Sequence, residues 1–199
     1  MGPQQSEFIL KQALAMGADE AIMLCDQKLK GSDTLITSQS LAAVIKKRPK
    51  QDLILCGQKS IDSETGHIGA QLSVELELPV ITNVIDFLSD ETGNIILERV
   101  QDNGIASIIC GNSAILTICR GTKMVRLPGI HGIAQAQKKM IICEDAKSIE
   151  LDTQILGKNS PTKVISVKNI QHAKRKGDKA QNLESGTEYL MAVFKKGGD

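Results

Sequence analysis

The chain has 199 residues, 41% of them hydrophobic, which is enough to bury one sizeable core with at most a small appendage. Its formal net charge of +1 argues against a broad positive electrostatic field that would attract nucleic acids or membrane surfaces. No apolar run approaches the roughly 18 residues that span a bilayer, and the first residues lack the basic and apolar regions of a signal peptide, so we expect a cytoplasmic protein.

Cysteine usage agrees with this expectation. The five cysteines, at positions 25, 56, 110, 119 and 143, form no C-x-x-C pair, and four of them lie in or beside apolar runs. This pattern favours buried, reduced thiols over a metal site or a disulfide.

The chain opens with a helix pattern followed by a strand pattern. The expected inward face of the helix consists of Phe8, Ile9, Ala13 and Met16. Gly17 is expected to end this helix as a left-handed cap. The apolar run 21–25 then predicts a strand.

A second helix is predicted from a cap at Ser32 or Asp33 through Lys47. Its expected inward face consists of Leu35, Leu41, Ala42 and Ile45. The run 52–56 predicts another strand, and residues 70–76 carry helical spacing. This α-β-α-β-α order predicts an α/β fold, in which a parallel sheet carries helices on both faces.

The pattern changes at Ile85. Stretches 94–101 and 105–110 flank Asp102-Asn103-Gly104, a strong hairpin signal, and a third strand over 114–119 completes an expected antiparallel insert. Residues 123–139 carry few strand or helix signals and are expected to form a loop. Residues 168–179 are basic and polar and predict a flexible arm, followed by an amphipathic helix over 185–196. We therefore expect a main domain over 1–167 and a C-terminal arm over 168–199.

The segment 57–69, Gly-Gln-Lys-Ser-Ile-Asp-Ser-Glu-Thr-Gly-His-Ile-Gly, points most directly to a function. It links a predicted strand to a predicted helix, and the first N–H groups of a helix have no partners within it. Those donors and the helix dipole favour an anion such as a nucleotide phosphate. The alternative is a helix capped by Ser63 or Thr65 that binds no ligand.

Four segments together resemble the β subunit of electron transfer flavoproteins. They are residues 1–5 with 13–20, the loop 57–69, residues 127–133 running into 136–139, and the motif Ser160-Pro161-Thr162-Lys163-Val164. Each is weak alone, but their order over most of residues 1–167 is specific. The resemblance implies an adenine-nucleotide α-hydrolase-like fold. It is expected to be incomplete at the N-terminus, because family members carry further chain, including their first strand, before Met1.

The resemblance also implies an electron carrier. Such β subunits form a heterodimer with an α subunit that holds an electron-carrying FAD, and they themselves bind AMP or a second FAD. Electrons pass between these flavins and acyl-CoA dehydrogenases or related flavoenzymes without catalysis by β-subunit side chains. The absence of catalytic residues agrees with the sequence, because His67, His131 and His172 have no obvious Ser, Cys or carboxylate companion.

The family's nucleotide contacts map mainly onto one continuous segment. Its members here are Gly57, Gln58, Lys59, Ser60, Ile61, Asp62, Ser63, Glu64, Thr65, Gly66, His67 and Ile68. Met1 and Gly2 match a strand end whose backbone meets the nucleotide. The resemblance places Thr34 and Thr37 near a flavin ring, although helix capping and local backbone bonding are an alternative role for both threonines.

Two features are more similar to the FAD-carrying, electron-bifurcating branch than to the AMP-binding branch. The first is the pattern Glu64-Thr65-x-x-Ile68-Gly69. The second is Asp33-Thr34 together with Thr37. In addition, Gly66-His67 departs from the AMP-binding branch, which has an Asn-Gln pair there. We therefore favour FAD over AMP as the ligand, with weak or no flavin binding by the chain as given, because the strands that wall the nucleotide are missing from it.

Ile130 matches the residue of a partner-recognition loop that places an aliphatic side chain in a pocket of the dehydrogenase. The family's lysines after this loop are mostly replaced by residues 134–137, which leaves Lys138 and Lys139 and predicts weaker electrostatic steering. The alternative is an ordinary surface loop with Ile130 turned inward.

The sequence leaves three alternatives to this function to consider. A stand-alone nucleotide-binding module of the universal-stress type needs a glycine-rich phosphate loop late in the chain, and residues 111–113 are a poor candidate. A nucleotide hydrolase-like enzyme needs an S-G-G-x-D-like loop, which the sequence lacks. A structural fragment that folds without binding a nucleotide stays open.

Overall fold

A computed structural model describes residues 1–89, 94–111, 113–121, 124–152, 154–166 and 182–196. Contacts divide the chain into two compact units, Met1–Lys163 and Val164–Asp199. All described strands belong to the first unit, and the second contains the helix α5 (Leu183–Lys196). The predicted arm over 168–179 lies outside the described residues.

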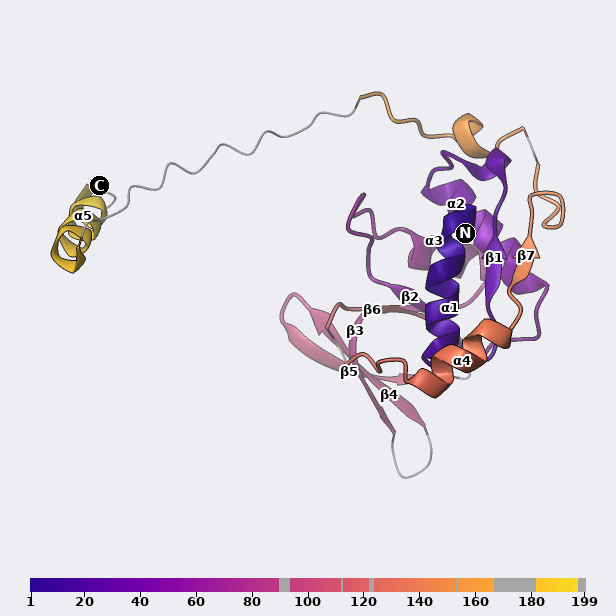
Figure 1. The fold of residues 1–199 in the computed structure, drawn as a ribbon, viewed down its shortest axis with the longest axis horizontal. Coiled ribbons are helices and arrows are strands. Elements are labelled where there is room, and N and C mark those ends of the chain that lie inside the picture. The colour runs from indigo at the N-terminus through magenta and orange to yellow at the C-terminus, as the bar shows by residue number, and fades with distance from the viewer. Residues whose placement is uncertain (90–93, 112, 122–123, 153, 167–181, 197–199) are drawn as a thin grey trace. The chain divides into compact units, whose positions relative to one another are not determined.

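The strands of the first unit form two sheets (Figure 1). A parallel pair joins β1 (Ile22–Leu24) to β7 (Ile142–Glu144). The larger sheet has the order β2-β6-β3-β4-β5, with β2, β6 and β3 parallel and β4 and β5 antiparallel. Its strands are β2 (Leu53–Gly57), β6 (Ala114–Ile118), β3 (Val80–Ser89), β4 (Ile95–Gln101) and β5 (Gly104–Cys110). The predicted α/β fold, a mostly parallel sheet flanked by helices, is confirmed.

Four helices of the first unit cover these strands or, in the case of the last, pack on the first helix. They are α1 (Glu7–Ala15), α2 (Thr34–Lys46), α3 (Ile68–Leu76) and α4 (Ile130–Lys138). Short 3-10 turns are η1 (Gln4–Ser6), η2 (Gln27–Leu29) and η3 (Gly157–Asn159). Helices α1 and α4 share a small core built on Leu14 and Ala136. Helix α2 contributes Ile36 and Val44 to the core beside β1, and Ala42 to the core between α3 and β6, so it packs against both sheets.

The predicted inward faces of the first two helices are wrong in part. In α1, Phe8 and Ile9 are exposed, and Leu14 is the buried residue instead. In α2, Leu35 is exposed and Ile36 is buried. Single-face periodicity failed for α2 because this helix is covered on two sides, by β1 and by α3. Gly17 does follow α1 in a positive-φ conformation, at +114°.

The predicted antiparallel insert is also corrected. β4 and β5 form the expected hairpin, but β6 lies between β2 and β3 and is parallel to both. The alternation of helices and parallel strands was expected to end near Val84, yet the strand β3 continues to Ser89. Its pairing with β6 shifts register between Ile81 and Val84, where Asn83 has a φ of +60°, and the strand then turns to pair with β4.

Two elements fall where no regular structure was expected. Residues 130–138 form α4 rather than a loop, and the short strand β7 follows it. None of the five cysteines, all of which lie among the described residues, forms a disulfide. The expectation of buried thiols holds only for Cys110, because Cys143 on β7 is exposed and the other three, Cys25, Cys56 and Cys119, are half-buried. The predicted last helix is present as α5.

Candidate nucleotide site

The loop 57–68 leaves the end of β2 and enters α3 without a side-chain cap. His67 occupies the cap position of α3 and makes no side-chain cap hydrogen bond among the described residues. The predicted caps, Ser63 and Thr65, are wrong, because the chain passes both and turns at Gly66, with a φ of +64°, before the helix begins. The first N–H groups of α3 are therefore left for another acceptor, such as an anion.

Gln58 fixes the start of this loop to the sheet. Its N–H donates to the Ile118 carbonyl at 3.0 Å, and its side-chain amide donates to Asn83 Oδ1 at 2.8 Å. A Cβ atom at Gly66 would lie 3.3 Å from the Gln58 carbonyl oxygen, whereas one at Gly57 would meet nothing within 4 Å. The loop thus folds back on its own origin at Gly66, where both the space and the conformation favour glycine.

The middle of the loop is exposed and bonded mainly to itself. Its exposed members are Lys59, Ser60, Ile61, Asp62, Ser63, Glu64, Thr65, Gly66 and His67. The Ser60 and Ser63 hydroxyls lie 2.9 Å apart, and Lys59 forms an ion pair with Glu64 at 3.2 Å. Hydrogen bonds from the Ser60 side chain and the Ser63 N–H lower the pKa of Asp62. The loop therefore presents hydroxyl and carboxylate groups to solvent.

Thr34 brings the start of α2 to the start of α3. Its hydroxyl lies 3.3 Å from His67 Nδ1 and accepts a hydrogen bond from Gln71 Nε2 at 3.4 Å. Asp33, not Thr34, caps α2, by accepting from the Ile36 N–H at 2.9 Å. The buried Gln71 Oε1 has no hydrogen-bond partner among the described residues, which leaves an acceptor available beside Thr34.

The remaining predicted residues are Thr37, which lies on α2, and Met1 and Gly2, which lie beside β1. Thr37 lies one turn along α2 from Thr34 and is half-buried. Gly2 is held beside β1, because its N–H donates to the Leu24 carbonyl at 3.0 Å. Met1 and Gly2 line a pocket, described next, whose walls include no residue of the loop 57–68.

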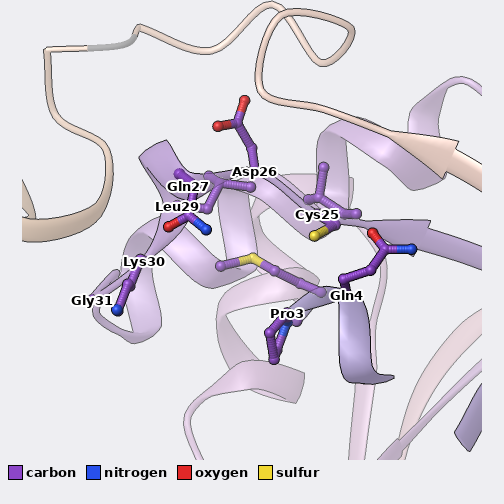
Figure 2. A pocket seen from close by; sticks show the side chains of 11 residues that line it. Pro3, Gln4, Cys25, Asp26, Gln27, Leu29, Lys30 and Gly31 are labelled. Atoms are coloured by element: carbon purple, nitrogen blue, oxygen red, sulfur yellow. The ribbon is translucent and has the colours of Figure 1, made fainter. Parts of the chain in front are cut away.

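This pocket lies at the carboxyl end of β1, the end at which parallel sheets usually bind ligands (Figure 2). Its volume is about 620 Å³. Figure 2 shows Pro3 and Gln4 on one side and Gln27, Leu29 and Lys30 on the other. The last three residues were not predicted, although a polar Asp26-Gln27 directly after an apolar strand could have indicated them.

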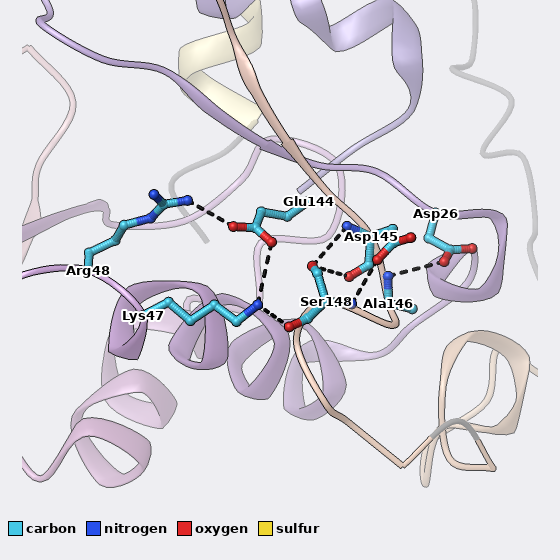
Figure 3. A network of polar contacts seen from close by, with 7 residues as sticks. All are labelled: Asp26, Lys47, Arg48, Glu144, Asp145, Ala146 and Ser148. Carbon is cyan, nitrogen blue, oxygen red and sulfur yellow. Dashed lines mark hydrogen bonds and ion pairs between the residues drawn. The ribbon is translucent and has the colours of Figure 1, made fainter.

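A polar network holds β7 and the segment after it against α2 (Figure 3). Glu144 pairs with Arg48 at 2.9 Å and with Lys47 at 3.5 Å, and the Lys47 ammonium also donates to the Ser148 carbonyl. A hydrogen bond from the Ser148 side chain and the two cations lower the pKa of Glu144, against the effect of burial. Asp26 accepts from the Ala146 N–H at 3.1 Å, which ties this network to the pocket wall.

The predicted recognition residue lies at the start of α4. Ile130 is 89% exposed, so the alternative of an inward-facing side chain is wrong. Helix α4 packs closely on α1 at Gly132. A Cβ atom at this position would come within 2.4 Å of the Ala15 carbonyl oxygen, so only glycine allows this approach. The Lys139 ammonium donates to the Ala18 carbonyl at 2.8 Å, which leaves Lys138 as the exposed lysine of the expected pair.

Two kinds of feature are absent from the described part of the chain. None of its helices combines the length and apolar character that a membrane crossing requires. None of its His, Cys, Asp and Glu side chains gather in groups of three that could hold a metal ion.

Comparisons with known proteins agree on one family. Residues 1–148 match the model of the electron transfer flavoprotein domain. The chain is 38% identical to the electron transfer flavoprotein subunit beta of Thermoanaerobacterium thermosaccharolyticum, over 83% of this chain and 64% of that protein. It is 38% identical to the caffeyl-CoA reductase-Etf complex subunit CarD of Acetobacterium woodii, over 82% and 63%. It is 32% identical to the acryloyl-CoA reductase electron transfer subunit gamma of Anaerotignum propionicum, over 82% and 64%.

The matched segment includes every structural feature described above for the nucleotide loop and for α4. The chain spans a little under two thirds of the length of these curated relatives. The chain belongs to the electron transfer flavoprotein family and is related to its β subunits.

Proposed function

We propose that this chain is the β subunit of a heterodimeric electron transfer flavoprotein and contributes a nucleotide site to it. The observation that carries the proposal is the junction of α2 and α3, where Thr34 meets His67 beside a helix start without a side-chain cap. Hydroxyl groups and free N–H groups at one place suit the phosphates and ribitol of a dinucleotide. The names of the relatives, which describe electron transfer subunits, support the same role.

The residues present fit FAD better than AMP. Gly66 adds no side chain at the helix start, so backbone can approach a diphosphate, and His67 adds a donor. Thr34, Thr37 and Glu64 offer hydroxyl and carboxylate groups to a ligand longer than AMP. A bound flavin would supply one-electron and two-electron transfer, while the chain's own residues hold and orient it.

The electron partners are proposed to be flavoenzymes of the acyl-CoA dehydrogenase type or related reductases. Two relatives are named as subunits of CoA-ester reductase systems, the caffeyl-CoA and acryloyl-CoA reductases. No described residue is assigned acid–base catalysis. The chain's part is to bind the nucleotide, meet the α subunit and present Ile130 to the electron donor or acceptor.

Equilibrium dialysis of the heterodimer against FAD and against AMP, counting nucleotide bound beyond the one FAD of the α subunit, tests the nucleotide site. Thr34→Val is expected to weaken nucleotide binding about tenfold, because it removes the hydroxyl shared with His67 and Gln71. Ser113→Ala removes a hydroxyl that donates to the Gln51 carbonyl, before β2 and outside the proposed site, and is expected to leave binding unchanged. Binding of neither nucleotide would favour the alternative of a structural fragment.

The nucleotide content of the heterodimer distinguishes the two ligands. Two FAD per heterodimer are expected after denaturation and chromatography of the released nucleotides. One FAD and one AMP would place the chain in the AMP-binding branch instead.

A further inference from the structure

Three side chains at the candidate nucleotide site form a hydrogen-bonded relay. His67 and Gln71 lie one turn apart at the start of α3, where the Gln71 N–H donates to the His67 carbonyl at 2.9 Å. Side chains at this spacing share one face of a helix. Both meet the hydroxyl of Thr34, the first residue of α2, which lies 3.3 Å from His67 Nδ1 and 3.4 Å from Gln71 Nε2.

The donors and acceptors that surround Thr34 fix the direction of this relay. A threonine hydroxyl has one hydrogen to donate and two lone pairs that accept. The amide of Gln71 donates to Thr34 Oγ1, so the hydroxyl hydrogen is left for another partner. Among the described residues, the other group bonded to this hydroxyl is His67 Nδ1. Thr34 therefore donates to Nδ1, which must carry a lone pair, and the proton of the neutral imidazole lies on Nε2.

The orientation of the Gln71 amide decides this direction. Its Nε2 faces Thr34, whereas its Oε1 is buried and has no hydrogen-bond partner among the described residues. An amide turned the other way would offer Thr34 a carbonyl acceptor, and the hydroxyl would then accept from a proton on His67 Nδ1. The amide thus selects between the two tautomers of His67, and it acts through Thr34.

The selected tautomer suits the chemistry of the site. The His67 side chain is exposed, and its Nε2 takes part in none of the hydrogen bonds found among the described residues. A neutral imidazole with its proton on Nε2 presents a donor at the cap position of α3, where the helix N–H groups have no side-chain cap. With the proton on Nδ1, the same Nε2 would present a lone pair, which repels a phosphate oxygen. The relay therefore determines whether an uncharged His67 attracts or repels an anion.

We propose that Gln71 is a positioning residue of the nucleotide site, which acts through Thr34 to hold His67 as the tautomer protonated on Nε2. The inference rests on the proposed function for the identity of the ligand, a nucleotide with phosphate groups. Gln71 itself is assigned no contact with that ligand. Its role is to make His67 a hydrogen-bond donor to phosphate without requiring the charged imidazolium.

Nitrogen NMR of the heterodimer, assembled with this chain isotopically labelled at histidine, measures the tautomer of His67. Protonated and unprotonated ring nitrogens differ widely in chemical shift, and the His67 signals are those that a His67→Asn variant lacks. At about pH 8.5, where histidine side chains are neutral, the parent is expected to carry this proton on Nε2. Gln71→Glu offers Thr34 only acceptors, so the His67 proton is expected to move mainly to Nδ1. Gln71→Leu, which adds no charge, is expected to give a mixture of both tautomers.

Two further variants separate the relay from other effects of these changes. In a Thr34→Val background, Gln71→Glu is expected to leave the tautomer as it is in Thr34→Val alone, because the linking hydroxyl is missing. Gln39→Leu is the matched control, since Gln39 Nε2 donates to Glu75 Oε1 at 3.1 Å and also joins α2 to α3. It is expected to leave both the tautomer of His67 and the nucleotide affinity unchanged.

Equilibrium dialysis of the same heterodimers against FAD and against AMP measures the consequence for binding. Gln71→Glu is expected to weaken nucleotide binding about tenfold, because the tautomer that donates becomes the minor one. Thermal unfolding of each heterodimer establishes that the variants are folded before their tautomers are compared.

The tautomer and the binding measurement fail separately. If neither Gln71→Glu nor Gln71→Leu changes the tautomer of His67, the inference is overturned while the proposed function stands. An equal shift by Gln71→Glu in the Thr34→Val background also overturns it, because the carboxylate would then act on His67 directly. If the tautomer shifts as expected but the parent heterodimer binds no nucleotide beyond the one FAD of the α subunit, the proposed function fails, and Gln71 positions no nucleotide contact.

Discussion

The carboxylate of Asp33 accepts two hydrogen bonds from Thr162, one from its N–H at 3.0 Å and one from its hydroxyl at 2.8 Å. The other carboxylate oxygen of Asp33 caps α2 through the Ile36 N–H. The Asp33 N–H donates to Ser160 Oγ at 3.1 Å. Two residues of the motif 160–164, Ser160 and Thr162, therefore bond to Asp33. The last residues of the first unit are thereby fixed to the helix start that carries Thr34.

Asp33→Asn is expected to lower the free energy of unfolding by about 1–2 kcal/mol at pH 7, because it weakens the cap and the link to Thr162. Burial raises the pKa of Asp33, but the hydrogen bonds from Ile36 and Thr162 outweigh it, so the pKa in the folded state is lowered. The carboxylate therefore stabilises the fold above its unfolded-state pKa of about 4, and this contribution is lost as pH falls through the folded-state pKa.

Urea denaturation at pH 7 and at pH 3 measures this effect. The difference between parent and variant is expected to shrink at pH 3. Asp102→Asn, in the exposed β4–β5 turn, serves as the control and is expected to show little difference at either pH. An equal loss for Asp33→Asn at both pH values would contradict the proposed role of the charge.

Gly69→Ala is expected to destabilise the fold by about 1–3 kcal/mol, although alanine favours a helix by about 1 kcal/mol over glycine. A Cβ at Gly69 would lie 2.4 Å from Thr117 Cγ2, where α3 packs on β6. Thermal unfolding monitored by circular dichroism measures the loss.

A double-mutant cycle identifies the cause of that loss. Thr117→Ser removes the methyl group but keeps the hydroxyl that accepts from the Asn83 N–H at 3.1 Å. Adding this change to Gly69→Ala is expected to recover part of the lost stability. Gly111→Ala, where a Cβ meets nothing within 4 Å, is the control. Strict additivity in the cycle would show that the contact with Thr117 is not responsible.

Ile130→Ala is expected to slow electron transfer between the heterodimer and its flavoenzyme partner about tenfold or more, because an exposed aliphatic anchor is lost. Stopped-flow flavin absorbance measures the rate. Met140→Ala removes a side chain of similar exposure, 88%, just beyond α4 and is expected to leave the rate unchanged. Unchanged transfer by Ile130→Ala would remove this residue from the recognition surface.

Helix α5 is expected to exchange its amide hydrogens rapidly in the isolated chain and slowly in the heterodimer. Its apolar side chains, including Leu190 and Phe194, are exposed, and a 14-residue helix alone is marginal in water. Hydrogen–deuterium exchange with mass spectrometry measures the protection. Strong protection in the isolated chain would mean that the helix packs within its own chain.

Local signals in the sequence were sufficient for much of the fold. Asp33 caps α2 and Gly17 follows α1 because caps depend on residues only a few positions away. The Asp102-Asn103-Gly104 turn identified the β4–β5 hairpin for the same reason. The place of β6 could not be predicted, because a strand is assigned to a sheet position by partners that lie far away in sequence, here β2 and β3.

The candidate site shows the same division. The loop 57–68 was visible as a glycine-bearing link between a strand and a helix. The contact of Thr34 with His67 joins residues 33 positions apart, and the contact of Asp33 with Thr162 joins residues 129 apart, so neither has a local signal. The pocket at β1 depends on Gln27 and Lys30, whose grouping with Met1 arises only when Gly2 pairs with Leu24.

The position of α2 has a consequence for how the first unit loses its structure. The described strands form two sheets that share no ladder, and α2 contributes side chains to the cores of both. Cooperativity between the two halves therefore depends in large part on this helix. On heating, the β1–β7 half is expected to melt before the half built on β2, β6 and β3. A nucleotide that touched Gly2 on one side and the start of α3 on the other would act as a second coupling between them. Ligand would then merge two melting steps into one.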